Sequence, residues 1–391
     1  MRECLNCLKC IFLMVCLYIV LLILIFLIPD KGIQVHRDEA ISYINEVGYY
    51  PNIFFGSSSA KMDNLTDSVM LQLTEPGAEN PFISAMVPGY ARYWHGYLVF
   101  LRPLLWIFDY FQIRFLGYFL STMLLAVLFG LLLKRLGWGV SIAFAVSIVL
   151  VRFTVVPVSL QFSSCFNIMM VFSIWLLHKL DKISVEELHL AVPFAIVGSV
   201  VNFVDFLTAP LVTLGIPLAI YISEKIKANA RLWKNHVFDV FRLSFFWGLG
   251  YGITWILKWL CATVFLKENI LADAYKSILF RVDGNQEYPV NRILTIGKNI
   301  FYVMGSDGIK VLFPALAFMI IALLIMFWKA GKKAAALLPL MLIVCMPYVW
   351  YFILANHSYI HGYFTYRVQI VSLFAGGVML CFLWEWERKR K

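Results

Sequence analysis

The stretch "ANHSYIHGYFTYR", residues 355–367, places His357, His361 and Arg367 among four aromatic residues. Arginine and histidine side chains donate hydrogen bonds to phosphate and hydroxyl oxygens, so we consider a phosphorylated or hydroxylated ligand first. The two histidines are four residues apart and would share one face of a helix, which also makes them candidate metal ligands. The local sequence offers no further ligand, and structural hydrogen bonding is the remaining alternative.

Carboxylates that could act as a general base lie in two stretches, "VHRDEAISY" (35–43) and "SSAKMDNLTDSVML" (58–71). They are Asp38, Glu39, Asp63 and Asp67. A base needs hydrogen-bond reach to the hydroxyl that it deprotonates, and a carboxylate near a bilayer could meet both a hydroxyl and a lipid-borne leaving group. We expect Asp38 to be the base, with Asp63 as its main rival and Glu39 beside it. The alternative is that these carboxylates only keep a loop soluble.

Further candidate substrate contacts occur in three other stretches. Arg92, His95 and Arg102 follow one another in "GYARYWHGYLVFLRPLL", where guanidinium groups suit phosphate and aromatic faces suit sugar rings. Asp205 lies in the short connection "NFVDFLTAP", and Lys258 lies inside an apolar run. The alternatives are an aromatic belt at the membrane surface, a helix cap at Asp205 and a lysine that reaches toward the surface.

The composition predicts the scaffold that positions these residues. Apolar residues make up 61% of the 391 residues, charged residues make up 14%, and the mean hydropathy is +0.80. This is more apolar surface than one soluble core can bury, and the excess recurs in runs of about 20 residues, which is typical of an all-α membrane protein. None of the eight cysteines lies in a predicted long outer loop, so we expect no disulfide framework.

We predict about ten transmembrane helices. The first covers Cys10–Pro29, and the others cover 115–133, 138–156, 159–177, 189–204, 207–222, 242–263, 309–327, 334–354 and 368–385. The chain is then organised as 1–29 (tail and first helix), 30–114 (a long first outer loop with interfacial helices), 115–265 (six helices), 266–308 (a second outer loop) and 309–391 (three helices and a basic tail).

The distribution of Lys and Arg predicts the orientation. The short outer segments contain only Arg152 and Arg367, whereas pairs such as Lys134–Arg135 and Lys332–Lys333 fall on the other side with both termini. Because cytoplasmic segments are enriched in Lys and Arg, we expect both termini to be cytoplasmic and the candidate site residues to face outward. A bacterial inner membrane suits this pattern.

Several of these features resemble the GT-C superfamily of membrane glycosyltransferases. They are the retained first helix, an acidic "DEA..Y" element in the first outer loop (Asp38, Glu39, Ala40 and Tyr43), the interfacial "HGYLVFLRPLL", and the following "IRFLGYFLSTML" and "LKRLGW". The resemblance covers about residues 30–135 best, and the later spans share only the general layout. The doubled-proline element of the family is absent.

The resemblance implies an inverting transfer of a sugar from a polyprenyl-phosphate donor to a glycan or lipid-linked acceptor. An acid of the first outer loop would deprotonate the acceptor, and cationic groups would stabilise the leaving phosphate. A divalent metal is optional in such enzymes, and we expect no cofactor and no nucleic-acid partner. A flippase or transporter of lipid-linked sugars and an envelope polysaccharide polymerase or ligase are the alternative functions.

Overall fold

The computed structural model describes residues 2–53, 58–287, 289–305, 320–321 and 324–389. These residues form helices and no strand, as an all-α membrane protein requires. Six helical stretches in this part of the chain are long and apolar enough to cross a membrane. They are Glu3–Phe26, Tyr110–Leu136, Leu160–Leu180, Val212–Leu266, Lys333–Ile353 and Gly362–Arg388.

These six stretches are fewer than the predicted count of about ten spans, and the difference has three sources. The stretch Val212–Leu266 combines two predicted spans in α10 (Val212–Asn229) and α11 (Trp233–Leu266), which η3 (Ala230–Leu232) joins. Two other predicted spans correspond to shorter apolar helices, α7 (Trp138–Leu150) and α9 (Ala191–Val204). The predicted span 309–327 lies largely outside the described residues.

Helix boundaries differ from the predicted ones where local capping decides them. α1 (Arg2–Phe26) already includes most of the predicted tail. α6 (Tyr110–Leu136) starts before residue 115, because Asp109 and Gln112 form a capping box at its first turn. α7 ends well before residue 156, because Arg152 adopts a positive φ of 55° and starts η2 (Phe153–Val158).

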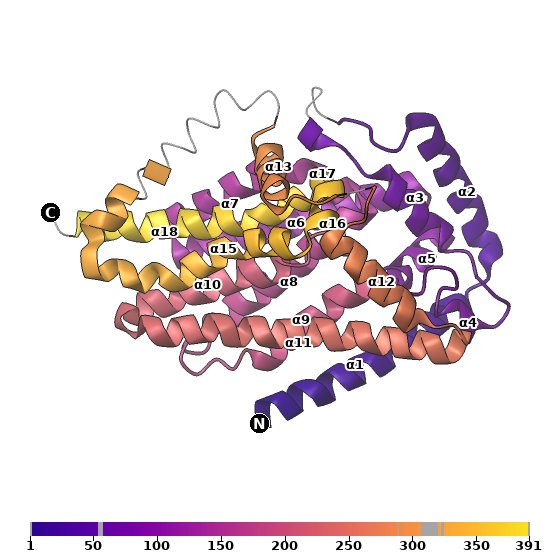
Figure 1. Cartoon of the computed structure of the whole chain (residues 1–391), viewed down its shortest axis with the longest axis horizontal. Coiled ribbons are helices and arrows are strands. Elements are labelled where there is room, and N and C mark those ends of the chain that lie inside the picture. Colours follow the sequence, from indigo (N-terminus) through magenta and orange to yellow (C-terminus); the bar gives the residue numbers. More distant parts are fainter. Residues whose placement is uncertain (1, 54–57, 288, 306–319, 322–323, 390–391) are drawn as a thin grey trace.

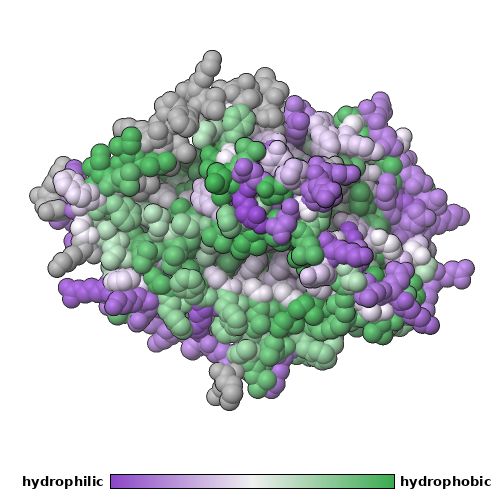
Figure 2. Space-filling model, viewed as in Figure 1, coloured by the Kyte–Doolittle hydropathy of each residue, from purple (hydrophilic) through white to green (hydrophobic). Residues whose placement is uncertain are grey.

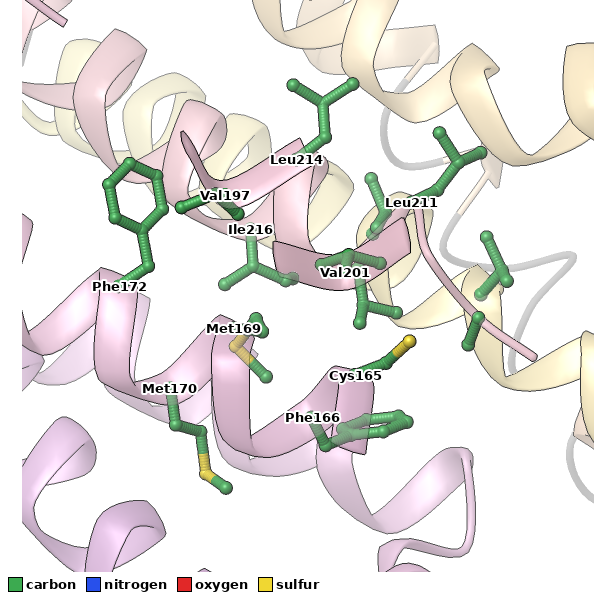
Figure 3. Packing of buried hydrophobic residues seen from close by; sticks show 14 of the residues in the cluster. Cys165, Phe166, Met169, Met170, Phe172, Val197, Val201, Leu211, Leu214 and Ile216 are labelled. Carbon is green, nitrogen blue, oxygen red and sulfur yellow. The ribbon is translucent and has the colours of Figure 1, made fainter. Parts of the chain in front are cut away.

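The centre of the bundle is formed by α8 (Leu160–Leu180), α9, α10 and α11. In Figure 3, Met169 of α8 lies opposite Ile216 of α10, and Phe166 of α8 and Val201 of α9 belong to the same buried apolar layer. α9 and α11 approach so closely that a Cβ atom at Gly198 would lie 2.1 Å from the carbonyl oxygen of Trp247. Small residues permit such close packing, which holds helices together where lipid surrounds them.

One end of the bundle, which we call the loop end, carries most of the short helices (Figure 1). They are α2 (Asp30–Val47), η1 (Ser58–Ala60), α3 (Asn64–Gln72), α4 (Pro81–Ser84), α5 (Leu98–Ile107), α12 (Ile270–Asp283), α13 (Arg292–Met304), α16 (Ala355–Ile360), α17 (Gly362–Thr365) and η5 (Tyr366–Gln369). Figure 2 shows much hydrophobic surface over the middle of the bundle, hydrophilic surface at this end and smaller hydrophilic patches at the opposite end.

The opposite end, which we call the basic end, is tied together by ion pairs. Arg135 of α6 pairs with Asp181 after α8 and with Glu224 of α10, at 2.8 and 2.7 Å. Arg242 of α11 pairs with Glu3 of α1 at 2.5 Å. Near the same end, η4 (Gly331–Leu337) leads into α15 (Leu338–Ile353), and α18 (Ile370–Arg388) ends close to the C-terminus. The bias of positive charge identifies this end as the expected cytoplasmic one.

Cysteine labelling tests this orientation. Glu79 at the loop end and Ser184 at the basic end are both exposed. In a variant in which the eight native cysteines are replaced, we expect a membrane-impermeant thiol reagent to label Glu79→Cys in intact cells and to label Ser184→Cys only after permeabilisation. Labelling in the reverse pattern would contradict the orientation.

Candidate functional site

Asp63 lies buried at the loop end, where it caps α3. Its Oδ1 accepts a hydrogen bond from the backbone N–H of Thr66 at 3.1 Å, and its Oδ2 accepts one from the Thr66 hydroxyl at 2.7 Å. Tyr363 of α17 donates its hydroxyl to the same Oδ2 at 3.3 Å. Burial raises the pKa of Asp63 above its usual value, although these hydrogen bonds oppose the shift. The first loop and the 355–367 stretch therefore meet at this carboxylate.

Arg367 also contacts Tyr363 and is only 1% exposed. Its Nη1 donates to the backbone oxygen of Tyr363 at 3.1 Å, and its guanidinium carbon lies 4.4 Å from the ring centroid of Phe162 and 4.9 Å from that of Tyr366. Its Nε and Nη2 are buried without a hydrogen-bond partner. Unpartnered buried donors are costly, so an anionic ligand would satisfy this guanidinium.

Asp67 lies one turn after Asp63 and holds α3 against the start of α8. It accepts hydrogen bonds from the backbone N–H groups of Leu160 and Gln161 at 3.2 and 3.3 Å and from the hydroxyls of Ser159 and Tyr110 at 3.3 and 2.9 Å. A carboxylate is favourable at a helix N-terminus. Burial raises the pKa of Asp67 to about 6. Its full set of partners gives it a structural role.

An apolar groove of about 850 Å³ lies between α5, α6, η2, α8 and α9. Phe100 and Phe119 line it and are also exposed on the apolar surface of the helices, so the groove opens toward the lipid. Arg114 is the charged residue of the lining, and its Nη2 lies 2.8 Å from the sulfur of Met62, the residue before Asp63. Arg114 thus links the groove lining to the residue that precedes Asp63 in the sequence, although Asp63 itself does not line the groove.

His357 and His361 lie together, with ring centroids 4.9 Å apart, beside Arg281 of α12. Arg281 Nη1 donates to His357 Nδ1 at 2.5 Å, and His357 Nε2 donates to the backbone oxygen of Leu207 at 3.0 Å. His361 stacks on Phe364 at 5.1 Å. The described residues contain no group of three His, Cys, Asp or Glu side chains that could hold a metal ion. This geometry favours hydrogen bonding over metal binding.

Asp38 and Glu39, by contrast, lie on the exposed face of α2. The Asp38 side chain is 60% exposed, and its ion-pair partner is Arg37 at 3.5 Å. Among the described residues, no contact joins either carboxylate to Asp63 or Arg367. The position of Asp38 is therefore less suited to a base than that of Asp63.

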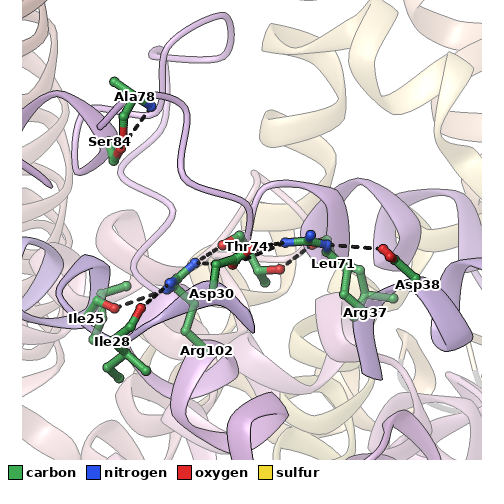
Figure 4. Close-up of polar contacts among 10 residues, drawn as sticks. All are labelled: Ile25, Ile28, Asp30, Arg37, Asp38, Leu71, Thr74, Ala78, Ser84 and Arg102. Carbon is green, nitrogen blue, oxygen red and sulfur yellow. Dashed lines mark hydrogen bonds and ion pairs between the residues drawn. The ribbon is translucent and has the colours of Figure 1, made fainter. Parts of the chain in front are cut away.

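Arg102 is completely buried in a network that joins α1, α2, α3 and α5 (Figure 4). Its Nε and Nη2 donate to the backbone oxygens of Ile25 and Ile28 at 3.1 and 2.9 Å, and its Nη1 donates to Asp30 at 3.3 Å and to the backbone oxygen of Thr74. Because four of its five N–H donors bond to the protein and the side chain is completely buried, Arg102 fixes the start of the loop end and is poorly placed to bind a substrate.

Arg92 and Lys258 anchor the chain between α4 and α5. Arg92 pairs with Asp273 of α12 at 2.9 Å. Lys258 is completely buried in α11, and its Nζ donates to the backbone oxygen of Met86 at 3.0 Å. Arg92 and Lys258 therefore have partners within the protein, and these contacts account for their positions without a substrate.

His95 and Asp205 also form hydrogen bonds with backbone groups a few residues away in the sequence. His95 has a positive φ of 57°, and its Nε2 lies 2.7 Å from the backbone oxygen of Tyr90. Burial lowers the pKa of His95 to about 3, so it is neutral at physiological pH. Asp205 accepts from the backbone N–H of Thr208 at 2.8 Å, and burial raises its pKa to about 6. Both residues shape the connections beside the histidines.

Sequence reasoning did not single out Arg281, Arg114 or the hydroxyl of Tyr363. Arg281 belongs to the second long loop, and its approach to His357 depends on how α12 packs on α16. Arg114 precedes the predicted span 115–133 in the sequence, and only the early start of α6 places it at the groove. No sequence pattern marks such long-range contacts.

Arg102 provides a test that separates structural from binding roles. Arg102→Met should lower the free energy of unfolding by about 3 kcal/mol or more, because it leaves the backbone oxygens of Ile25, Ile28 and Thr74 without their donor and removes one of the two arginine partners of Asp30. Arg292→Gln removes a partly exposed pair with Asp283 and should cost only about 0–1 kcal/mol. Unfolding in detergent measures both values. Parent-like stability in Arg102→Met together with lost ligand binding would contradict the structural role.

In comparisons with known proteins, no family model, curated protein or solved structure matches this chain.

Proposed function

We propose that this chain is a membrane glycosyltransferase of the GT-C type, which moves a sugar from a polyprenyl-phosphate donor to a glycan or lipid-linked acceptor at the outer membrane face. The observation that carries the proposal is that Tyr363 contacts both a buried carboxylate, Asp63, and the guanidinium of Arg367, whose Nε and Nη2 have no partner, at the end of the bundle where an apolar groove also lies. This arrangement offers a base, an anion-binding group and a lipid-binding surface at one end of the bundle.

In the proposed reaction, Asp63 is the base. The acceptor hydroxyl gives its proton to Asp63 while its oxygen forms a bond to the anomeric carbon of the donor sugar, and the bond from that carbon to the phosphate oxygen breaks. The hydrogen bond from Tyr363 is the longest of those to Asp63, so an acceptor hydroxyl would replace Tyr363 at Oδ2. The raised pKa of Asp63 makes it a stronger base than an exposed carboxylate.

Arg367 binds the leaving phosphate in this proposal. Its Nε and Nη2 provide two adjacent donors, and the rings of Phe162 and Tyr366 hold the guanidinium plane in place. A planar two-point donor matches phosphate oxygens, and it stabilises the charge that develops as the lipid phosphate departs. No metal is needed for this step.

The groove would hold the isoprenoid chain of the donor. Its lining is almost entirely apolar. Its charged residue, Arg114, contacts the sulfur of Met62, the residue before Asp63. A long unsaturated hydrocarbon can enter such a groove sideways from the bilayer, which would deliver its phosphate to the loop end.

The same groove also suits a flippase or transporter of lipid-linked sugars, which is the second candidate function. The two functions differ in whether a bond is cleaved. Radiolabel from a polyprenyl-phosphate sugar should appear in a glycan product if the chain is a transferase, whereas counterflow of the intact donor between membrane faces without product would support a transporter.

The role of Asp63 can be tested against that of the two exposed carboxylates. Asp63→Asn should lower the rate of sugar transfer by about 100-fold or more with donor binding retained, because a base acts mainly in the transition state. Asp38→Asn and Glu39→Gln should stay within about threefold of the parent rate, as exposed residues outside the site do. Loss of transfer in Asp38→Asn with full transfer in Asp63→Asn would show that Asp38 of α2, and not Asp63, is the base.

The role of Arg367 can be tested by keeping its charge and changing its shape. Arg367→Lys should weaken donor binding by about 1–3 kcal/mol, because lysine lacks the planar pair of donors. Arg152→Lys, at another arginine of the loop end, should bind donor as the parent does. A chelator should leave donor binding and sugar transfer by the parent protein unchanged. Parent-like donor affinity in Arg367→Lys, or activity that needs a divalent ion, would contradict this role.

A further inference from the structure

Arg281, His357 and His361, which we call the histidine cluster, form a second cationic group at the loop end. Because the backbone oxygen of Leu207 accepts from His357 Nε2, that nitrogen carries the proton, and His357 Nδ1 is left to accept from Arg281. His357 is thus a neutral ring, and it does not offset the charge of Arg281.

Arg281 points into the protein without a carboxylate partner among the described residues. Burial has the largest effect on the pKa values of Tyr93, His357 and His361, and the charge of Arg281 acts to lower all three. Tyr93 belongs to the chain before α5, His357 belongs to α16, and His361 directly follows α16. Arg281 is half-buried and has these aromatic and imidazole neighbours in place of an acid, so no carboxylate in the described part of the chain neutralises its charge and it is available to an anion.

His361 supplies the second observation. Its Nδ1 is buried and has no hydrogen-bond partner, and its ring contacts those of His357 and Phe364. An unpartnered imidazole nitrogen next to an uncompensated guanidinium is the arrangement that an oxyanion would complete by accepting one hydrogen bond from each.

Phe364 and Tyr363 connect this cluster to the Asp63 and Arg367 centre. The Phe364 ring stacks on His361 and lies 6.0 Å from that of Phe162, which contacts Arg367, and the Tyr363 ring lies 6.3 Å from that of His361. The stretch 355–367 therefore contributes to two neighbouring cationic sites, of which the proposed reaction uses one.

We propose that the histidine cluster binds a second phosphoryl group, separate from the phosphate at Arg367. The phosphoryl oxygens accept from the Arg281 guanidinium and from His361 Nδ1–H. The group belongs to an acceptor or to a lipid headgroup at the loop end. Binding at the cluster does not depend on the proposed transfer reaction, and the experiment below separates the two.

Imidazole resonances report this binding directly. The chain contains seven histidines, so in full-length protein labelled with ¹⁵N-histidine in phosphatidylcholine nanodiscs, His361→Gln identifies the His361 signals by their loss. Burial and the Arg281 charge lower the pKa of His361 to about 4, so its ring is neutral at pH 7. Added inorganic phosphate should shift the His361 signals in a saturable way and leave the signal of the distant His178 in place.

Variants on α12 provide the matched comparison. Arg281→Gln should weaken the phosphate response of His361 by about tenfold or more, and Arg281→Lys by less, because a charged donor is retained. Lys276→Gln removes the same charge from an exposed position of the same helix and should leave the response unchanged. The other histidine signals show whether each variant is folded. An unchanged response in a folded Arg281→Gln would overturn the proposal.

Two further arms identify the source of the phosphoryl group and separate the proposals. Nanodiscs that contain phosphatidic acid should shift the His361 signals without added phosphate if a headgroup is the ligand, whereas a response to soluble phosphate alone assigns an acceptor group. No response in either arm rejects the site. Asp63→Asn should lose sugar transfer and keep the His361 response, so failure of one proposal is distinguishable from failure of the other.

Discussion

The hydrogen bonds between Asp67 and the first turn of α8 are the contacts on which the candidate site depends. They fix α3 at the loop end, and because Asp63 caps the same short helix, they also fix the position of the proposed base. The same turn of α8 carries Phe162, which supports Arg367. One carboxylate at a helix N-terminus thereby helps to place both the base and the cation that contact Tyr363.

The arginines of the loop end differ in what their nitrogens contact, and this difference separates scaffold from site. All three nitrogens of Arg102 are bonded to backbone oxygens or to Asp30, so its burial is compensated within the protein. Arg367 is buried with two nitrogens that have no partner, and the half-buried Arg281 contacts a neutral histidine. Buried donors without partners are costly, so Arg367 marks a position where a ligand would complete the structure.

The sequence predicted the helical class, most helix positions and the region in which polar groups gather, because apolar runs and capping residues are local signals. It placed Asp63 and Arg367 among the candidates. It ranked Asp38 above Asp63, because nothing local shows that α2 turns Asp38 toward solvent while α3 buries Asp63. Arg102 was a candidate phosphate ligand for the same reason: its partners at Ile25, Asp30 and Thr74 come from three separate elements.

A structure of the protein with a non-cleavable phosphonate analogue of a polyprenyl-phosphate sugar tests the account most directly. We predict that the isoprenoid chain lies in the groove between α6 and α8, that phosphonate oxygens lie about 3 Å from Nε and Nη2 of Arg367, and that the anomeric carbon faces Asp63. A phosphonate bound beside Asp38 on α2, with the Arg367 nitrogens still unpartnered, would contradict the account.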